Sequence, residues 1–171
     1  MEEEKSVILI PLKKDEWEDF IIRNQNAFAL PFIEKFGEID EDVIPIEDIL
    51  SSLEHENAKS FNILHDNKVV GGVVLQIDET TNHNSLDLLF LDHEYHNLGL
   101  GYEVWKTVEG LYPNTLVWET HTPYFDVRNI HFYVNKCGFS IVEFYNMNHP
   151  EEGRQNSTEE ELFFRFEKKM K

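Results

Sequence analysis

The pattern of apolar and polar positions predicts a strand, a polar loop and an amphipathic helix near the middle of the chain. The run Leu86–Leu91 has the length of a buried strand and contains neither glycine nor proline. Residues 92–97 are too polar to continue that strand. Beyond them, apolar residues recur at the spacing of one helix face, at Leu100, Val104, Val108 and Leu111. We therefore expect a strand-to-helix connection within Leu86–Tyr112.

The rest of the pattern predicts a single sheet covered by helices. Strands are expected over residues 6–12, 60–65, 68–78, 115–120, 139–145 and 162–168, and helices over residues 15–28, 46–56 and 126–136. Pro31 should interrupt the first helix and leave one more turn over residues 32–36. Gly71-Gly72 inside a strand indicates a bulge or a close backbone approach. The order predicts a mixed α/β fold, with an antiparallel meander over residues 60–91 and parallel neighbours where a helix crosses over.

Length and composition place the chain in the class of globular domains. Its 171 residues are one domain's length, and 41% of them are apolar. A single cysteine, Cys137, excludes an internal disulfide and a cysteine-based metal site. The N-terminal segment lacks the basic region of a signal peptide, and no apolar run has membrane-spanning length. We therefore expect a cytoplasmic protein without a membrane partner.

The charge is strongly acidic. There are 33 acidic and 15 basic residues, a net charge of −18. A nucleic acid is an unsuitable partner, because binding phosphates requires clustered lysine and arginine. A cationic small molecule or a basic peptide would be attracted instead, although such a charge can also serve solubility alone.

Two glycines mark the start of the central helix. Gly99 and Gly101 permit positive φ and leave no Cβ in the way of a close approach. A helix that begins there exposes unpaired N–H groups and the positive end of its dipole, which together bind phosphate. The alternative is a tight connection without a ligand. The stretch has no GxxxxGK[ST] motif, and Val104 occupies the third glycine position of a dinucleotide-binding fingerprint.

Two motifs resemble those of the GCN5-related N-acetyltransferases, the GNAT family. The family pattern [Q/R]-x-x-G-x-[G/A] is similar to His96-Asn97-Leu98-Gly99-Leu100-Gly101, with histidine in the first position. Its second pattern, N-x-x-A-x-x-F-Y-x-x-x-G-F, resembles the stretch from Asp126 to Tyr133 followed by Gly138-Phe139. Strand order agrees over residues 60–145, whereas residues 1–56 match only in having two helices.

The resemblance implies a single GNAT domain over residues 1–171, with a mixed, mostly antiparallel sheet that splays at its centre. Residues 60–145 would bind the co-substrate acetyl-CoA, and the variable residues 1–56 would border the acceptor. Pyrophosphate would lie on the turn formed by His96, Asn97, Leu98, Gly99, Leu100 and Gly101. Pantetheine would lie between the strands 86–91 and 115–120 and contact Asn129. The backbone N–H of Leu91 would bind the thioester carbonyl and its oxyanion.

The resemblance also implies two proton transfers. Tyr133 matches the tyrosine that protonates the departing thiolate, but four residues lie between it and Gly138 where the family pattern has three. An extension at the helix end would leave Tyr133 in place, whereas a shift within the helix would present Val134 instead. The base that accepts the amine proton would be Asp87, on the strand parity of Leu89 and Leu91, or Glu119 in the opposite strand. Either carboxylate could also be merely structural.

The expected reaction is direct transfer of acetyl, through a tetrahedral intermediate, to a primary amine of a small cationic molecule or peptide. The alternatives are a non-catalytic acyl-CoA-binding module and an acyltransferase with another acyl donor. His93, His96, His121 and His131 lie in the same half of the chain, but no HExxH motif supports a metal site and we expect none. His121 is a weaker candidate base than either carboxylate. The oligomeric state, a homodimer included, stays open.

Overall fold

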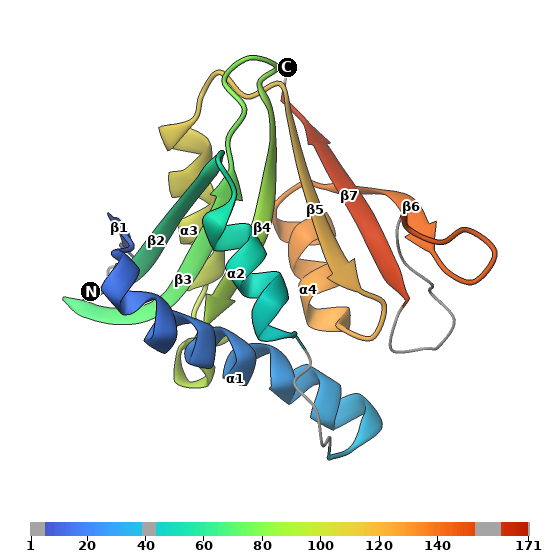
Figure 1. The fold of residues 1–171 in the computed structure, drawn as a ribbon, viewed down its shortest axis with the longest axis horizontal. Helices are drawn as coiled ribbons and strands as arrows, with labels where there is room; N and C mark the ends of the chain where they lie inside the picture. Colours follow the sequence, from blue (N-terminus) through green and yellow to red (C-terminus); the bar gives the residue numbers. More distant parts are fainter. Residues whose placement is uncertain (1–5, 39–43, 153–161, 171) are drawn as a thin grey trace.

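The computed structural model describes residues 6–38, 44–152 and 162–170. In these residues the chain forms one sheet with the strand order β1-β2-β3-β4-β5-β7-β6 (Figure 1). The strands are β1 (Ile8–Pro11), β2 (Ala58–His65), β3 (Lys68–Gln76), β4 (His83–Leu91), β5 (Val117–Pro123), β6 (Ser140–Tyr145) and β7 (Phe163–Lys169). The α-helices are α1 (Trp17–Phe36), α2 (Ile46–Glu54), α3 (Leu100–Leu111) and α4 (Val127–His131).

The sheet parts between β4 and β5. These neighbours are parallel, and they pair only from His83↔Val117 to Leu86↔Thr120. Beyond that point β4 stays paired with β3 and β5 with β7, so the two strands diverge toward their carboxyl ends (Figure 1). All other described strand pairs are antiparallel. The predicted mixed sheet with a central splay is confirmed.

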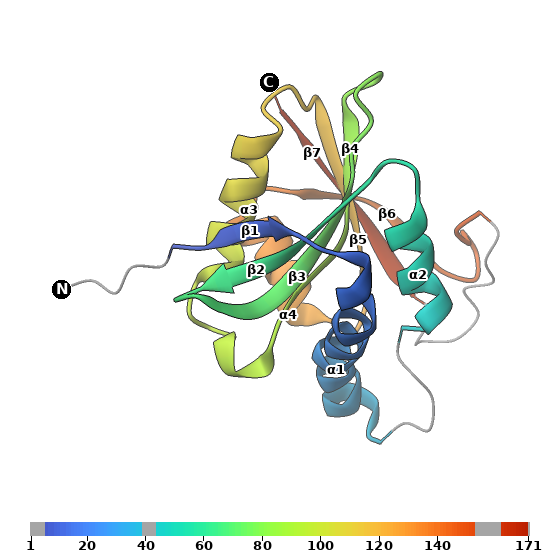
Figure 2. The same ribbon diagram turned by 60° about the vertical axis from the view of Figure 1, so that its left-hand side comes forward.

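Helices cover both faces of the sheet, α1 and α2 on one side and α3 and α4 on the other (Figure 2). In α1, α2 and α3 residues four apart are buried, as in Ile49 and Leu53 of α2. The core under α3 and α4 includes the rings of Trp105 and Trp118, with centroids 5.2 Å apart. The smaller core under α1 and α2 includes Phe20, which packs edge-on against Phe90 at 5.1 Å.

The glycine pair of β3 permits a close approach. A Cβ on Gly71 would overlap the carbonyl oxygen of Phe90, and one on Gly72 would overlap the ring of Phe20. A register shift at Ile63/Leu64 lies opposite this part of β3, so both features that the sequence indicated are present.

The predicted interruption at Pro31 is wrong, since α1 is continuous from Trp17 to Phe36 with Pro31 inside it. A proline inside a helix costs roughly 3 kcal/mol through the lost hydrogen bond and the ring clash. Two side chains after the proline dock on the far side of the splay, where the rings of Phe32 and Phe36 lie 5.3 and 5.4 Å from that of Phe125. This long-range contact stabilises the last turns of α1. None of the described helices combines the length and apolar character of a membrane span.

Candidate functional site

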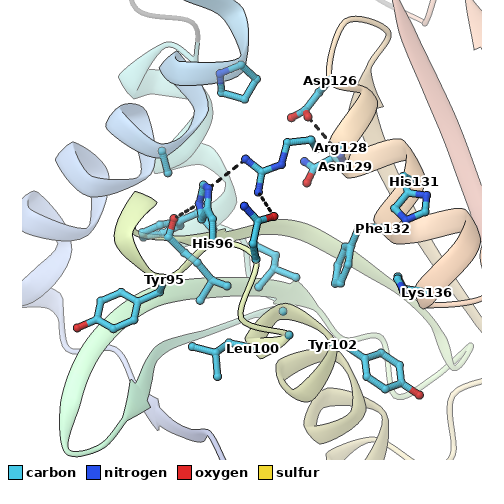
Figure 3. A pocket seen from close by; sticks show the side chains of 18 of the residues that line it. Tyr95, His96, Leu100, Tyr102, Asp126, Arg128, Asn129, His131, Phe132 and Lys136 are labelled. Carbon is cyan, nitrogen blue, oxygen red and sulfur yellow. Dashed lines mark hydrogen bonds between the residues drawn. The ribbon is translucent and has the colours of Figure 1, made fainter. Parts of the chain in front are cut away.

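A cavity of about 690 Å³ lies at the open end of the splay (Figure 3). One wall is the end of β4, residues 89–91, and another is the turn that leads into α3. The α4 segment forms the opposite wall, and Ala27, Phe28 and Pro31 of α1 close one side. The cavity therefore brings together segments from the first quarter of the chain and from both predicted motifs.

The glycine turn presents unpaired N–H groups to this cavity. Asn97 has φ 63° and Gly99 has φ 78°, and Gly99 is the N-cap of α3. No described residue accepts a hydrogen bond from the N–H of Asn97, Leu98 or Gly99. The first turn of α3 adds N–H groups that have no partner within the helix. The turn is therefore suited to an anion.

Gly101 serves a different purpose from Gly99. A Cβ at this position would lie 3.2 Å from the ring of Phe132 on the opposite wall of the cavity. The absent side chain thus makes room for the protein's own ring. Of the six residues from His96 to Gly101, Leu98 alone does not line the cavity, and its side chain is exposed.

His96 joins the glycine turn to α4. Its Nε2 lies 2.7 Å from the carbonyl oxygen of Leu91, and its Nδ1 lies 3.3 Å from Nη1 of Arg128. Burial, with a smaller contribution from Arg128, lowers the pKa of His96. The neutral ring can then donate from Nε2 to Leu91 and accept from Arg128 at Nδ1. Arg128 also donates from Nη2 to Oδ1 of Asn97 at 3.3 Å, so these side chains clamp the turn (Figure 3).

The backbone of Leu91 points into the splay. The N–H of Asp92 donates to the carbonyl of Val70 in β3 at 2.8 Å. Because N–H groups alternate in direction along a strand, those of Leu89 and Leu91 point away from β3, toward the side that β5 has left. Both residues line the cavity, so their backbone N–H groups are available to a ligand in it.

The structure places Tyr133 in the core and not on the cavity wall. Its ring packs between Phe139 and Phe166, each with its centroid 5.7 Å away. Burial raises the pKa of the Tyr133 hydroxyl. A hydrogen bond with the Thr120 side chain lowers this pKa by a smaller amount. Since Thr120 is the last residue of β5 that pairs with β4, this hydroxyl lies at the apex of the splay.

The additional residue before Gly138 is taken up by a wide turn. Residues Phe132–Lys136 form a π-helical turn, in which the N–H of Cys137 donates to the carbonyl of Phe132 at 3.0 Å. Phe132, Asn135 and Lys136 of this turn line the cavity, whereas Tyr133 and Val134 do not.

Asp87 and Glu119 also lie outside the cavity lining. A register shift leaves Asp87 without a partner in β3, because Val74 pairs with Leu88 and Leu75 with Leu86. Asp87 accepts hydrogen bonds from Gln76 at 2.7 Å and from Ser85 at 3.1 Å. Gln76 also donates to α2, so Asp87 lies on the α2 face. The expectation that it shares the face of Leu89 and Leu91 is wrong, because the bulge reverses the alternation.

Glu119 lies on the same face as Asp87. Its neighbours Trp118 and Thr120 are buried on the α3 side, so the side chain of Glu119 projects to the other. It lies 3.6 Å from Nε2 of His121, and Ser85 pairs with it across the parallel strands. The two predicted carboxylates are therefore near the apex of the splay, across the sheet from α3 and α4. No three histidine, cysteine or acidic side chains of the described residues are grouped so as to hold a metal ion.

Asp126 is a residue of the site that was not predicted from the sequence. This residue caps α4 by accepting the N–H of Asn129 at 3.2 Å, and it lines the cavity although it is only 4% exposed. Burial raises the pKa of its carboxyl group. The available signal was the aspartate that stands where the family pattern has asparagine. Arg128, two residues later, carried no motif signal.

A sheet that parts between two parallel strands, beside a cavity bordered by a glycine turn with unpaired N–H groups, is the arrangement of N-acetyltransferase folds. The chain belongs to the acetyltransferase (GNAT) family, whose family model matches residues 22–139. It is 46% identical over 177 residues to the uncharacterized protein YrkN of Bacillus subtilis (strain 168), an alignment that covers 98% of this chain and 96% of YrkN.

Several solved structures share the fold. The ribosomal-protein-S18-alanine N-acetyltransferase of Escherichia coli aligns with a TM-score of 0.68 and 12% identity, over 95% of this chain and 92% of that one. The PaiA N-acetyltransferase of Thermoplasma acidophilum, in complex with coenzyme A, aligns with a TM-score of 0.66 and 17% identity. The alignment covers 96% of this chain and 99% of that one. The spermidine N-acetyltransferase of Vibrio cholerae, in complex with coenzyme A and spermine, aligns with a TM-score of 0.65 and 14% identity over 95% of each chain. At these identities the similarity is one of fold.

Proposed function

We propose that the protein transfers the acetyl group of acetyl-CoA to a primary amine of a small cationic molecule or peptide. The observation that carries this proposal is the row of unpaired N–H groups at residues 97–99, which faces a cavity that ends at the parted strands. Main-chain donors at a helix N-terminus bind phosphate without a basic side chain. The cavity residues thus fit a ligand with a diphosphate at one end.

Further residues suit the same ligand. Arg128 and Lys136 add positive charge to the cavity lining of a chain whose net charge is −18. The pantetheine arm would lie along residues 89–91 and the side chain of Asn129. Acetyl-CoA supplies the acetyl group as a thioester, and the N–H of Leu91 would donate to the carbonyl oxygen of that thioester.

The acceptor amine would reach the thioester from the α1 side. Residues of α1 line the cavity, which supports the expected role of the N-terminal helices as the acceptor wall. A basic acceptor suits the acidic chain. A family neighbour, the Vibrio cholerae enzyme, is named for acetylation of the polyamine spermidine, which supports a small amine as the substrate class. The buried thiol of Cys137 is free, which is compatible with the cytoplasmic location that we also propose.

Tyr133 would protonate the departing thiolate. Its raised pKa keeps the hydroxyl protonated at neutral pH, and the hydroxyl lies at the apex of the splay. The base predicted from sequence, Asp87 or Glu119, would have to act through water, because neither side chain lines the cavity. The burial of Tyr133 specifically favours a second candidate function, a non-catalytic acyl-CoA-binding module.

Release of free thiol distinguishes the two functions. Purified protein is incubated with acetyl-CoA and a panel of primary amines that includes spermidine, and free thiol is measured over time. We expect amine-dependent release, and acetylated amine detected by mass spectrometry. Thermal stabilisation by coenzyme A without thiol release would identify the binding module. Release with a longer acyl-CoA but not with acetyl-CoA would identify another acyl donor. Calorimetry without heat of coenzyme A binding would refute both functions.

A further inference from the structure

One carboxylate inside the cavity forms no ion pair with any described residue. Asp126 is 4% exposed, and its Oδ1 accepts the N–H of Asn129 at 3.2 Å. No other described group donates a hydrogen bond to the side chain, and no described cation lies within ion-pair distance of it. A buried carboxylate is costly unless it is paired or protonated. Oδ2 is thus available to a cationic ligand in the cavity.

The position of Asp126 divides the cavity into two ends. Asp126 lies on the α1 side of Arg128, whereas Leu100, Phe132 and Lys136 lie on the other side (Figure 3). The residues of α1 that close this end are apolar: Ala27, Phe28 and Pro31. The residue before Asp126, Phe125, is held between Phe32 and Phe36 of α1, which fixes the start of α4 beneath α1. Asp126 thus lies at the end of the cavity that apolar residues of α1 close.

We propose that Asp126 binds the ammonium group of the acceptor amine and accepts the proton that the amine must lose before it attacks. This inference rests on the proposed acetyl transfer. In the step, an N–H bond of the ammonium breaks, an O–H bond forms on Oδ2, and the electron pair stays on the nitrogen. The neutral amine then forms the new N–C bond to give the tetrahedral intermediate. As this intermediate collapses the C–S bond breaks, and the second proton of the nitrogen passes by way of Tyr133 to the departing thiolate. Asp126 would act in place of Asp87 and Glu119, which lie outside the cavity lining.

The charged and titratable groups around Asp126 come from each element packed against it. They are Glu34 of α1, His96 of the glycine turn, Arg128 of α4 and the buried Tyr133. Burial is the main cause that raises the pKa of Asp126, and the Asn129 N–H, Arg128 and His96 oppose it. Because a primary amine has a pKa of about 10.4, a carboxylate of raised pKa accepts its proton at a smaller free-energy cost. An anionic acceptor would leave the carboxylate unpaired, so the site selects cationic amines.

The capping role of Asp126 can be separated from this role. Asparagine caps a helix about as well as aspartate, whereas alanine does not. Asp126→Asn therefore keeps the cap and removes the charge, and Asp126→Ala removes both. A carboxylate with a raised pKa in the folded state lowers stability once it ionises. We therefore expect Asp126→Asn to have an equal or higher melting temperature at pH 8, with the difference vanishing on acidification. Asp126→Ala should melt at a lower temperature.

Spermidine is the probe for the acceptor site. Calorimetry in the presence of coenzyme A should show spermidine binding to the wild type, and about 10- to 100-fold weaker binding to Asp126→Asn, as expected for a lost charged hydrogen bond. Coenzyme A affinity should be unchanged. For turnover, kcat/KM of the wild type should fall as the pH drops through the pKa of Asp126, and Asp126→Asn should lack this limb.

Each other outcome has a definite meaning. Unaltered spermidine affinity and kcat/KM in Asp126→Asn would reduce Asp126 to a helix cap. Weaker coenzyme A binding would place the carboxylate on the cofactor arm and also overturn the inference. The inference would also be overturned if the fall of kcat/KM at low pH disappeared in Asp87→Asn or Glu119→Gln alone. It would likewise be overturned if the wild-type protein bound no spermidine. If the wild type releases no thiol but Asp126→Asn still loses spermidine affinity, acetyl transfer fails while the amine site stands.

Discussion

Replacing Gly99 with alanine tests whether the turn before α3 is built for an anion. Gly99 has φ 78° and ψ 5°, a left-handed conformation that costs an L-residue about 1–2 kcal/mol. Gly110, in the last turn of the same helix, has no positive φ, and a Cβ there would meet nothing within 4 Å. Gly110→Ala should therefore stabilise the protein by about 0.5–1 kcal/mol. The same substitution is thus expected to have opposite signs at the two ends of α3.

The expected effect on ligand binding follows from the unpaired N–H groups. Relaxation of the strained backbone in Gly99→Ala would turn the N–H groups of residues 97–99 away from the cavity. Each hydrogen bond to a charged group contributes about 1.5–3 kcal/mol, so the loss of one weakens coenzyme A binding by about tenfold or more. Gly110→Ala should bind coenzyme A as the wild type does. Urea denaturation measures the free energy of unfolding, and titration calorimetry measures the affinity.

Two results would refute this reasoning. Stabilisation of Gly99→Ala to the same extent as Gly110→Ala would show that the left-handed conformation is not required. Destabilisation of Gly99→Ala with unaltered coenzyme A affinity would show that the turn only connects β4 to α3, the alternative that the sequence left open.

Three further substitutions test the site and its supports. Tyr133→Phe should lower kcat by at least about tenfold with little change in coenzyme A affinity, and equal losses in both would indicate a structural tyrosine. The stability of the wild type should fall below pH 6.5, because unfolded His96 takes up a proton that the folded ring, with its lowered pKa, resists. His96→Gln should lose that part of the pH dependence in urea denaturation at pH 5.5 and 7.5, and a constant difference would contradict it. Phe125→Ala should destabilise the protein by about 3–5 kcal/mol in the same assay, and an effect below about 1 kcal/mol would mean that α1 does not depend on this ring.

The elements that the sequence predicted well are those specified by local properties. Leu100, Val104 and Val108 recur at helical spacing, and all three are buried in α3. Gly99 and Gly101 both permit a positive φ, and Gly99 adopts one whereas Gly101 does not. Helical spacing and backbone preference depend only on residues close together in the sequence. They can therefore be predicted without knowing which distant segments pack against them.

The predictions that failed, or that missed a residue, concern contacts between distant segments. Pro31 was expected to end a helix, but aromatic docking on Phe125 sustains α1 beyond it. Asp87 was assigned to a face by alternation, and a bulge against β3 reversed that face. Asp126 stands where the family pattern has asparagine, and only the approach of α1 shows that its carboxyl group is buried in the cavity.

The sequence by itself determined the family resemblance, the order of elements and the turn at Gly99. Periodicity, turn chemistry and motif spacing are local properties of the sequence and do not depend on how distant segments pack together. Only the tertiary structure decided that Asp126 lines the cavity while Asp87 and Glu119 do not, and that the Tyr133 ring is buried. Burial and desolvation are set by side chains from distant segments, such as Pro31 of α1 and Asp126 before α4, and the free energy of a charge depends on that environment.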